Sequence, residues 1–357
     1  MTTDQIWANE ERAVFALRGL YQRYGYTPYK MSQFEEYDLY VRNKDFLISD
    51  RMITFSGEGG KLMALKPDVT LSIVKNAPEE PGVVQKVYYS ENVYRDYREI
   101  MQAGLECVGD LTRYDIAEVV LLAVKSLALL GGRYVLDISH MGLLAAVLER
   151  CGFDGEQRKR AMGCLRRKNA HDLKALCGEN RGAWEVLQAL SACRGGAEAL
   201  DALRPYLTAG PERRAAEELE ALLGILKSGG QEAQVRLDFS VSNDLGYYSG
   251  VVFRGYLEGI PESILSGGQY DKLPRKMGRR SKAIGFAVYA DLLQERSREE
   301  SPFDVDTLIL HDGSVPLTEL TEAAEAAARD GSVLVAASMP TGRSWKKLVR
   351  MEGGNAR

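Results

Sequence analysis

An Ala-, Leu-, Arg- and Glu-rich stretch between about residues 141 and 226 most constrains the fold of this chain, because it interrupts a series of short β-rich segments. Gly152, Gly182 and Pro211 divide the stretch, and this pattern predicts several short helices. Strand-like segments lie on both sides of it. We therefore predict a sheet protein into which an all-helical unit is inserted.

The segments before residue 141 predict an α+β core. Apolar residues recur at helical spacing between residues 4 and 24, and a strongly apolar helix is expected over residues 115–130. Asp68 lies near the N-terminus of a third helix, expected over residues 69–76. A hairpin-type turn is expected over residues 56–60, and strands are expected at residues 26–34, 52–55, 62–65, 83–89, 93–97, 104–109 and 134–138. This order indicates a largely antiparallel sheet with helices packed against it.

Strand signals resume after the helical stretch, at residues 235–239, 247–253 and 284–288. A polar linker at 295–301 precedes a strand–helix–strand pattern at 305–310, 316–329 and 333–337. The predicted domains are a core made of residues 1–140 and 227–298, an insertion at 141–226, and a linker with a small α/β unit at 299–357.

Composition excludes several classes of function. The 46 Lys plus Arg and 50 Asp plus Glu give a net charge of −4, so a whole-chain basic footprint for nucleic acid is absent. No apolar run approaches the roughly 18 residues that span a bilayer, and no secretory signal is visible. The cysteines form no C-x-x-C pair, which indicates reduced thiols in a cytoplasmic protein; they are Cys107, Cys151, Cys164, Cys177 and Cys193.

Motifs for metals and common cofactors are missing. His140, His171 and His311 lie far apart in the sequence, with no carboxylate or cysteine at ligand spacing, so no metal site is expected. The sequence has no G-x-S-x-G elbow, no G-x-x-x-x-G-K-[ST] loop and no G-x-G-x-x-G turn. We expect no resident cofactor.

Four ordered segments carry a family resemblance. They are Gly25-Tyr26 with Phe34-Glu35; Leu65-Lys66-Pro67-Asp68-Val69-Thr70; the run from Val93 to Glu106; and a group made of residues 244–253, 266–271 and 283–286. In this order and at these separations they resemble the class II histidyl-tRNA synthetase fold over roughly residues 10–295. Each segment alone is weak evidence, whereas their conjunction is specific.

The resemblance implies a retained amino-acid pocket. Its expected histidine-binding residues are Asp68, Thr70, Gln102, Glu106, Tyr247, Tyr248, Gly267, Gly268 and Tyr270, with Asp271 beside them in a Gly-Gly-x-Tyr-Asp loop. Gln102 and Glu106 are four apart on an expected strand and should project from one face. In this interpretation Asp68 pairs with the α-ammonium, while Glu106 and Tyr248 hydrogen-bond the imidazole nitrogens.

The adenylation residues of the synthetase family are largely lost. Arg95 of the second motif is present, but Asp96 joins directly to Tyr97-Arg98, which removes the loop that clamps ATP in that family. Cations placed where phosphoryl charge develops are central to such chemistry. The family's glycine and arginine in the third motif are replaced by Tyr289 and Leu292, and further family positions are occupied by Ser32, Asn243 and Gln269.

A chain that keeps the amino-acid pocket but lacks the triphosphate-binding residues resembles the regulatory subunit of ATP phosphoribosyltransferase. That resemblance implies a non-catalytic role in histidine biosynthesis, with L-histidine as ligand and a short-form catalytic subunit as partner. It also implies a homodimer core, a possible hetero-octamer, and no role for tRNA or a membrane. Arg95 and Arg98 would then be a residual nucleotide or anion site. Residues 303–357 supply only part of the synthetase family's C-terminal domain.

Alternative interpretations remain at this point. The chain could be a divergent, active histidyl-tRNA synthetase, or a free-standing amino-acid-binding paralogue. Gln102 and Glu106 could lie on a solvated sheet face, and the two tyrosines could serve strand packing. Arg95 and Arg98 could be structural ion-pair partners, and the basic cluster between Arg275 and Lys282 a solvated loop.

Overall fold

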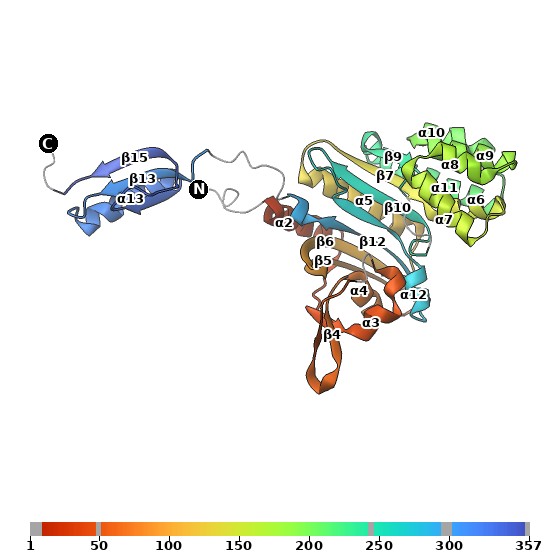
Figure 1. Ribbon diagram of the computed structural model, residues 1–357, viewed down its shortest axis with the longest axis horizontal. Helices are drawn as coiled ribbons and strands as arrows, with labels where there is room; N and C mark the ends of the chain where they lie inside the picture. Colours follow the sequence, from red (N-terminus) through yellow and green to blue (C-terminus); the bar gives the residue numbers. More distant parts are fainter. Residues whose placement is uncertain (1–8, 48–50, 242–245, 294–301, 354–357) are drawn as a thin grey trace. The chain divides into compact units, whose positions relative to one another are not determined.

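The computed structural model describes residues 9–47, 51–241, 246–293 and 302–353. The chain divides into two compact units, a larger one, Ala13–Glu295, and a smaller one that includes residues 302–353. The larger unit contains two sheets and the smaller unit one, and many of their elements are labelled in Figure 1. In the described part of the chain, no helix combines the length and apolar character needed to cross a membrane.

A nine-stranded sheet forms the centre of the larger unit, with the order β1-β5-β6-β12-β11-β10-β7-β9-β8. Neighbouring strands pair antiparallel except β1 with β5 and β7 with β9, so the predicted α+β, largely antiparallel arrangement is confirmed. The strands are β1 Thr27–Pro28, β5 Val84–Arg95, β6 Arg98–Gly109, β7 Tyr134–His140, β8 Arg194–Gly195, β9 Val235–Asp238, β10 Val251–Leu257, β11 Leu265–Gln269 and β12 Lys282–Tyr289.

The two faces of this sheet carry different helices, because successive strand residues point to opposite sides. On one face α2 (Asn9–Arg23) and α5 (Arg113–Leu130) pack into a large apolar cluster with Leu105 and Phe286. α5 begins with a capping box from Thr112 and ends at Gly131. On the other face α4 (Thr70–Asn76) and α12 (Lys272–Lys276) contribute to a smaller apolar cluster.

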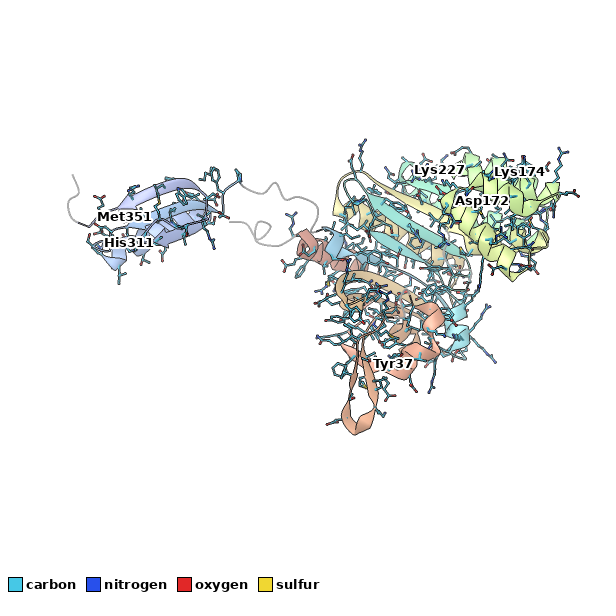
Figure 2. All side chains as sticks on the ribbon, in the orientation of Figure 1. Tyr37, Asp172, Lys174, Lys227, His311 and Met351 are labelled. Carbon is cyan, nitrogen blue, oxygen red and sulfur yellow. The ribbon has the colours of Figure 1, made fainter. Side chains whose placement is uncertain are left out.

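Short helices follow β7, as the composition of residues 141–226 predicts. They are α6 Met141–Arg150, α7 Gly155–Arg167, α8 Ala170–Cys177, α9 Arg181–Ala192, α10 Ala197–Leu203 and α11 Gly210–Ser228. Asp154, Asn169 and Asn180 each accept a backbone N–H at the start of a helix, which defines the breaks between them. The helices gather beside β7 and β9 (Figure 1), and Asp172, Lys174 and Lys227 lie on their outer surface (Figure 2).

A three-stranded sheet extends from the larger unit (Figure 1). It consists of β2 (Phe34–Glu36), β3 (Thr54–Ser56) and β4 (Leu62–Leu65), with β4 in the centre, and α3 (Tyr37–Arg42) follows β2. β3 and β4 pair antiparallel around the predicted turn, which contains a single 3₁₀ turn at Glu58–Gly60. Sequence patterns did not predict α3.

Several strand predictions were wrong in their extent. The strands predicted at 83–89 and 93–97 are parts of one continuous strand, β5, which begins at Val84 and ends at Arg95 and pairs along its whole length with β6. Residues 26–34 form no single strand; β1 and β2 occur instead, in different sheets. β10 begins only at Val251, so Tyr247 and Tyr248 lie in the preceding turn. The Gly267–Gly268 segment, expected as a loop, is part of strand β11.

The smaller unit is a three-stranded parallel sheet with one helix. Its elements are β13 Val305–His311, α13 Leu317–Asp330, β14 Val333–Ala336 and β15 Trp345–Met351, and β13 is central. The first three were predicted and β15 was not. The polar linker predicted at 295–301 lies outside the described residues.

Candidate functional site

The candidate site lies on the α4 face of the large sheet, where three neighbouring strands are in register. Glu106 on β6 pairs with Gly285 on β12, and Gly285 pairs with Gly268 on β11. Gln102, four residues before Glu106, pairs with Tyr289 by the same register. Because side-chain direction has a period of two, these residues share one face, as predicted for Gln102 and Glu106.

Glycines form the floor of the site. A β-carbon at Gly104 would lie 2.6 Å from the Tyr89 hydroxyl, and one at Gly268 would lie 2.8 Å from the ring of Tyr248. A β-carbon at Gly285 would lie 1.7 Å from Oε2 of Glu106. Each glycine therefore leaves room for one polar side chain to lie flat across the sheet.

Glu106 is the buried carboxyl at the centre of this floor, with 2% of its surface exposed. The hydroxyl of Thr70 donates to its Oε1 at 2.8 Å, and the phenol of Tyr270 donates to its Oε2. Burial nevertheless raises the pKa of Glu106 to about 8, because the two hydrogen bonds only partly replace its hydration. A ligand that brings a positive charge or a ring N–H donor would favour the ionised form.

Asp68 and Thr70 come from the N-terminus of α4, where the sequence predicted a cap. Asp68 accepts the backbone N–H of Leu71 at 2.9 Å, and burial raises the pKa of its carboxyl. The preceding Lys66 is buried and forms an ion pair with Glu91 of β5. This pair holds the Pro67-Asp68 turn against the β5–β6 hairpin.

Aromatic rings form a second wall. Tyr247 contacts Phe46, Tyr248 and Tyr270, with ring centroids 5.5, 4.5 and 5.9 Å apart. Burial raises the phenol pKa of Tyr247, Tyr248 and Tyr270 above the ordinary value, so all three stay neutral donors. Tyr247 and Tyr248 precede the strand, whereas Tyr270 directly follows β11.

The fold places the two arginines predicted as a residual anion site in different environments. Arg95 and Arg98 are backbone partners at the end of the β5–β6 hairpin, whose turn is Asp96-Tyr97. Arg95 is 5% exposed and lines the cavity, and its Nε has no hydrogen-bond acceptor. Arg98 is exposed and lies outside the lining residues.

These groups line a cavity of about 50 Å³. Cavities of roughly 150 Å³ hold a benzene molecule, so a ring-bearing ligand requires the walls to open. The predicted residues that line it are Asp68, Thr70, Arg95, Gln102, Glu106, Tyr247, Tyr248, Gly267 and Tyr270. Gly268 lies beneath Tyr248. Asp271 instead accepts the backbone N–H of Ala283 and the side chain of Gln269.

Sequence reasoning did not assign the remaining lining residues to the ligand pocket: Tyr89, Ser266, Gly285, Phe286, Ala287 and Tyr289. Tyr289 donates to or accepts from the hydroxyl of Ser266 at 2.9 Å, which fixes its ring in the cavity wall. Leu292 packs against the large apolar cluster. The period-two pattern of β11 and β12 is the signal that could have identified Ser266 and Ala287 as site residues.

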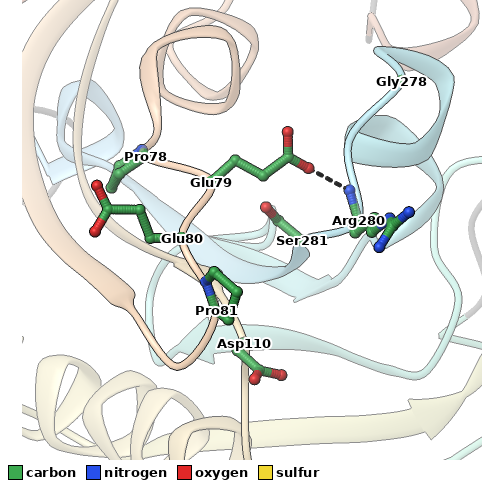
Figure 3. A pocket seen from close by; sticks show the side chains of 9 residues that line it. Pro78, Glu79, Glu80, Pro81, Asp110, Gly278, Arg280 and Ser281 are labelled. Atoms are coloured by element: carbon green, nitrogen blue, oxygen red, sulfur yellow. Dashed lines mark hydrogen bonds between the residues drawn. The ribbon is translucent and has the colours of Figure 1, made fainter.

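Larger cavities occur elsewhere in the same unit. One of about 470 Å³ lies between the Pro78–Pro81 loop, Asp110 and the Gly278–Ser281 turn (Figure 3). There Glu79 accepts the backbone N–H of Arg280, while Glu80 and Asp110 point in other directions. Across the part of the chain that the structure describes, no group of three His, Cys, Asp or Glu side chains could hold a metal ion.

Comparisons with known proteins agree with this fold. The model of the histidyl-tRNA synthetase family matches residues 3–293. The ATP phosphoribosyltransferase regulatory subunit of Syntrophotalea carbinolica is 30% identical over 320 residues, which are 84% of this chain and 74% of that protein.

Two solved structures share the fold. An ATP phosphoribosyltransferase regulatory subunit/histidyl-tRNA synthetase from Bacillus halodurans has a TM-score of 0.77 at 23% identity, covering 97% of this chain and 95% of the other. A chain of the ATP phosphoribosyltransferase (HisG:HisZ) complex from Thermotoga maritima has a TM-score of 0.62 at 18% identity, covering 79% and 97%. This chain therefore belongs to the histidyl-tRNA synthetase family, among its ATP phosphoribosyltransferase regulatory subunits.

Proposed function

We propose that this chain is a non-catalytic, histidine-responsive regulatory subunit. It binds L-histidine in the cavity around Glu106 and controls a short ATP phosphoribosyltransferase catalytic subunit. The observation that carries the proposal is the pair of buried carboxyl groups in that cavity, Asp68 and Glu106. Burial raises the pKa of both groups. A ligand with an ammonium group and a ring N–H would offset the cost of burying their negative charge.

Tyr289, Leu292 and the Asp96-Tyr97 turn argue against adenylation. The ring of Tyr289 forms part of the cavity wall, and Leu292 is part of an apolar contact. A two-residue turn leaves no loop that could close over a triphosphate. Phosphoryl transfer needs several cations around the transferring groups, and the cavity has one arginine.

Regulation requires that the ligand distinguish two states of the protein. The floor of the cavity belongs to the large sheet, whereas Tyr247 and Tyr248 lie in a turn before β10. Because the cavity is smaller than a ring-bearing ligand, we expect binding to displace part of this wall. A change of this kind could be passed to a partner subunit that contacts the same unit.

Pyrophosphate exchange tests the catalytic alternative. The purified chain, shown to be folded, is assayed for histidine-dependent exchange between ATP and pyrophosphate. We expect no exchange. Robust exchange would identify an active synthetase and overturn the non-catalytic assignment.

Reconstitution tests the regulatory role. The short catalytic subunit from the same organism is assayed for ATP phosphoribosyltransferase activity over a range of L-histidine concentrations, with and without this chain. We expect histidine inhibition to depend on the chain. The Thermotoga maritima complex supports a partnership of this type. Identical inhibition curves in the two assays would contradict it.

The assembly follows from the same proposal. We infer a cytoplasmic homodimer that joins catalytic subunits in a hetero-octamer. Light scattering of the isolated chain and of the reconstituted complex measures both masses. A monomeric chain, or a complex of other stoichiometry, would contradict this part without affecting the ligand assignment.

A further inference from the structure

A second cavity, the α5–α11 cavity, lies where the helical insertion meets the large sheet. It has a volume of about 210 Å³ and is lined by the start of α5, the second half of α11 and the ends of β10, β11 and β12. Its apolar wall contains Leu111, Ile116, Leu222, Ile225 and Val251. Because a cavity of roughly 150 Å³ holds a benzene molecule, this space accepts a six-membered ring without movement of its walls.

Two cations face this cavity from different elements. Arg113 is the first residue of α5 and Lys282 is the first residue of β12, and both line the cavity. Among the described residues, neither of them forms a salt bridge within 4.0 Å. Asp115, in the first turn of α5, pairs instead with Lys86. The positive charge of the two lining cations is therefore not cancelled by that acid.

Glu218 of α11 is the acid that lines the cavity, and it already has a partner. Nδ1 of His140 accepts the backbone N–H of Leu143 at 3.1 Å, so Nε2 carries the hydrogen and donates to Oε2 of Glu218 at 3.1 Å. This hydrogen bond, together with the charges of Arg113 and Lys282, holds the pKa of the Glu218 carboxyl below its ordinary value. Two cations and one ionised acid leave the cavity with one positive charge in excess.

The α5–α11 cavity and the cavity around Glu106 lie on opposite faces of the same strands. Gln269 ends β11 and lines the α5–α11 cavity, whereas the next residue, Tyr270, lines the Glu106 cavity. Consecutive side chains of a strand point to opposite faces of the sheet. A ligand in one cavity therefore leaves the other accessible.

We propose that the α5–α11 cavity is a second ligand site, which binds a small monoanion that carries an apolar ring and a carboxylate. The apolar wall receives the ring, and Arg113 and Lys282 receive the carboxylate. A cationic ligand would meet like charge, and a neutral one would leave the excess positive charge without a counter-ion. Since α5 belongs to the core and α11 to the helical insertion, the ligand contacts both parts.

Probes that share a phenyl ring and a propyl chain test the charge requirement. They are 3-phenylpropionate, 3-phenylpropionamide and 3-phenylpropylamine, and each is titrated into the full-length chain near neutral pH by ligand-observed NMR. Charge-assisted hydrogen bonds contribute enough to give a roughly 10- to 150-fold effect. We expect the carboxylate to bind more tightly than the amide by this factor, and the amine not to bind.

Variants of lining residues assign the probe to this cavity. Lys282→Met removes an exposed cation and should lower the affinity for the carboxylate to that for the amide. Ala221→Leu enlarges an exposed lining residue of α11, and it should abolish binding because the new side chain fills the apolar space. Lys227→Met is the matched control, since Lys227 is an exposed lysine of the same helix outside the cavity lining. It should leave every affinity unchanged, and melting curves establish that all variants are folded.

Competition with L-histidine separates this site from the Glu106 cavity. Saturating L-histidine should leave the affinity for 3-phenylpropionate unchanged, and displacement of the probe would overturn the second site. Equal affinities for the carboxylate and the amide, or full carboxylate binding by Lys282→Met, would overturn the anionic class of ligand. Absence of binding of every probe at millimolar concentration would overturn the proposal as a whole. None of these results alters the proposed function, which depends on L-histidine and the Glu106 cavity.

Discussion

The carboxylate of Glu106 occupies the space that a β-carbon on Gly285 would need. Oε2 of Glu106 would lie 1.7 Å from that carbon, and the two residues are paired between β6 and β12. A glycine opposite an acid on one face of a sheet allows the acid to lie across the neighbouring strand. The orientation of the central group in the site thus depends on a residue with no side chain.

Gly285→Ala should therefore abolish ligand binding while the chain still folds. The new methyl group would displace the Glu106 carboxylate from Thr70 and Tyr270, at a cost of roughly 1–3 kcal/mol in the free energy of unfolding. Calorimetric titration with L-histidine and urea unfolding measure the two effects. Gly19→Ala is the control, because a β-carbon at this helical position has open space and should stabilise the chain by about 0.5–1 kcal/mol. Unchanged histidine affinity in Gly285→Ala would contradict the site geometry.

L-Histidine should raise the melting temperature of the wild type, because a ligand that binds only the folded state stabilises it by mass action. Glu106→Ala should remove this shift. Glu99→Ala, an exposed position on the same strand, should retain it. Differential scanning fluorimetry at several histidine concentrations gives the comparison. A full shift in Glu106→Ala would remove Glu106 from the pocket.

The contribution of Glu106 to the stability of the ligand-free chain should decrease as the pH rises from about 4.5 to about 8. The folded-state pKa of about 8 exceeds the ordinary value of 4.5, so the folded chain binds more protons in this window and loses stability as they dissociate. The difference in unfolding free energy between the wild type and Glu106→Gln should change by on the order of a few kcal/mol across the window. Urea unfolding of both proteins at pH 5, 6.5 and 8 measures it. A constant difference would mean that the Glu106 pKa is not raised.

Tyr97→Gly should stabilise the chain by roughly 0.5–1 kcal/mol. Tyr97 is 80% exposed and has a φ of 62°, a region that glycine adopts without steric cost. Tyr97→Ala should give no comparable gain, because alanine is strained at the same φ. Chemical unfolding of the three proteins measures the differences. Equal stability of the Gly and Ala variants would show that backbone strain is absent.

Lys66→Met should destabilise the chain by about 3 kcal/mol, because it leaves Glu91 largely buried without a counter-charge. The double variant Lys66→Met/Glu91→Leu should recover most of that loss. A double-mutant cycle from urea unfolding yields the coupling between the two residues. Additive effects would indicate that the ion pair does not hold the Pro67-Asp68 turn against β5.

Local patterns in the sequence predicted much of this protein. The capped start of α4, the β3–β4 hairpin, the α5 helix and the helices after β7 all follow from short-range signals: caps, turn residues and periodicity. The common face of Gln102 and Glu106 follows from the period of a strand alone. The ordered motifs also indicated the family, which the comparisons confirm. The histidine ligand and the roles of the individual residues stay predictions.

Only the tertiary structure decided which side chains meet. The register that sets Glu106 against Gly285 and Gly268 joins strands more than 150 residues apart in sequence, and strand pairing at that distance leaves no local signal. The same holds for the burial of Arg95 and the exposure of Arg98, since two neighbouring arginines look alike until the hairpin assigns one to each environment. The sequence by itself determined the elements and the family, because these depend on nearby residues. Packing determined the charge and volume of the cavity, because these depend on residues brought together by the sheet.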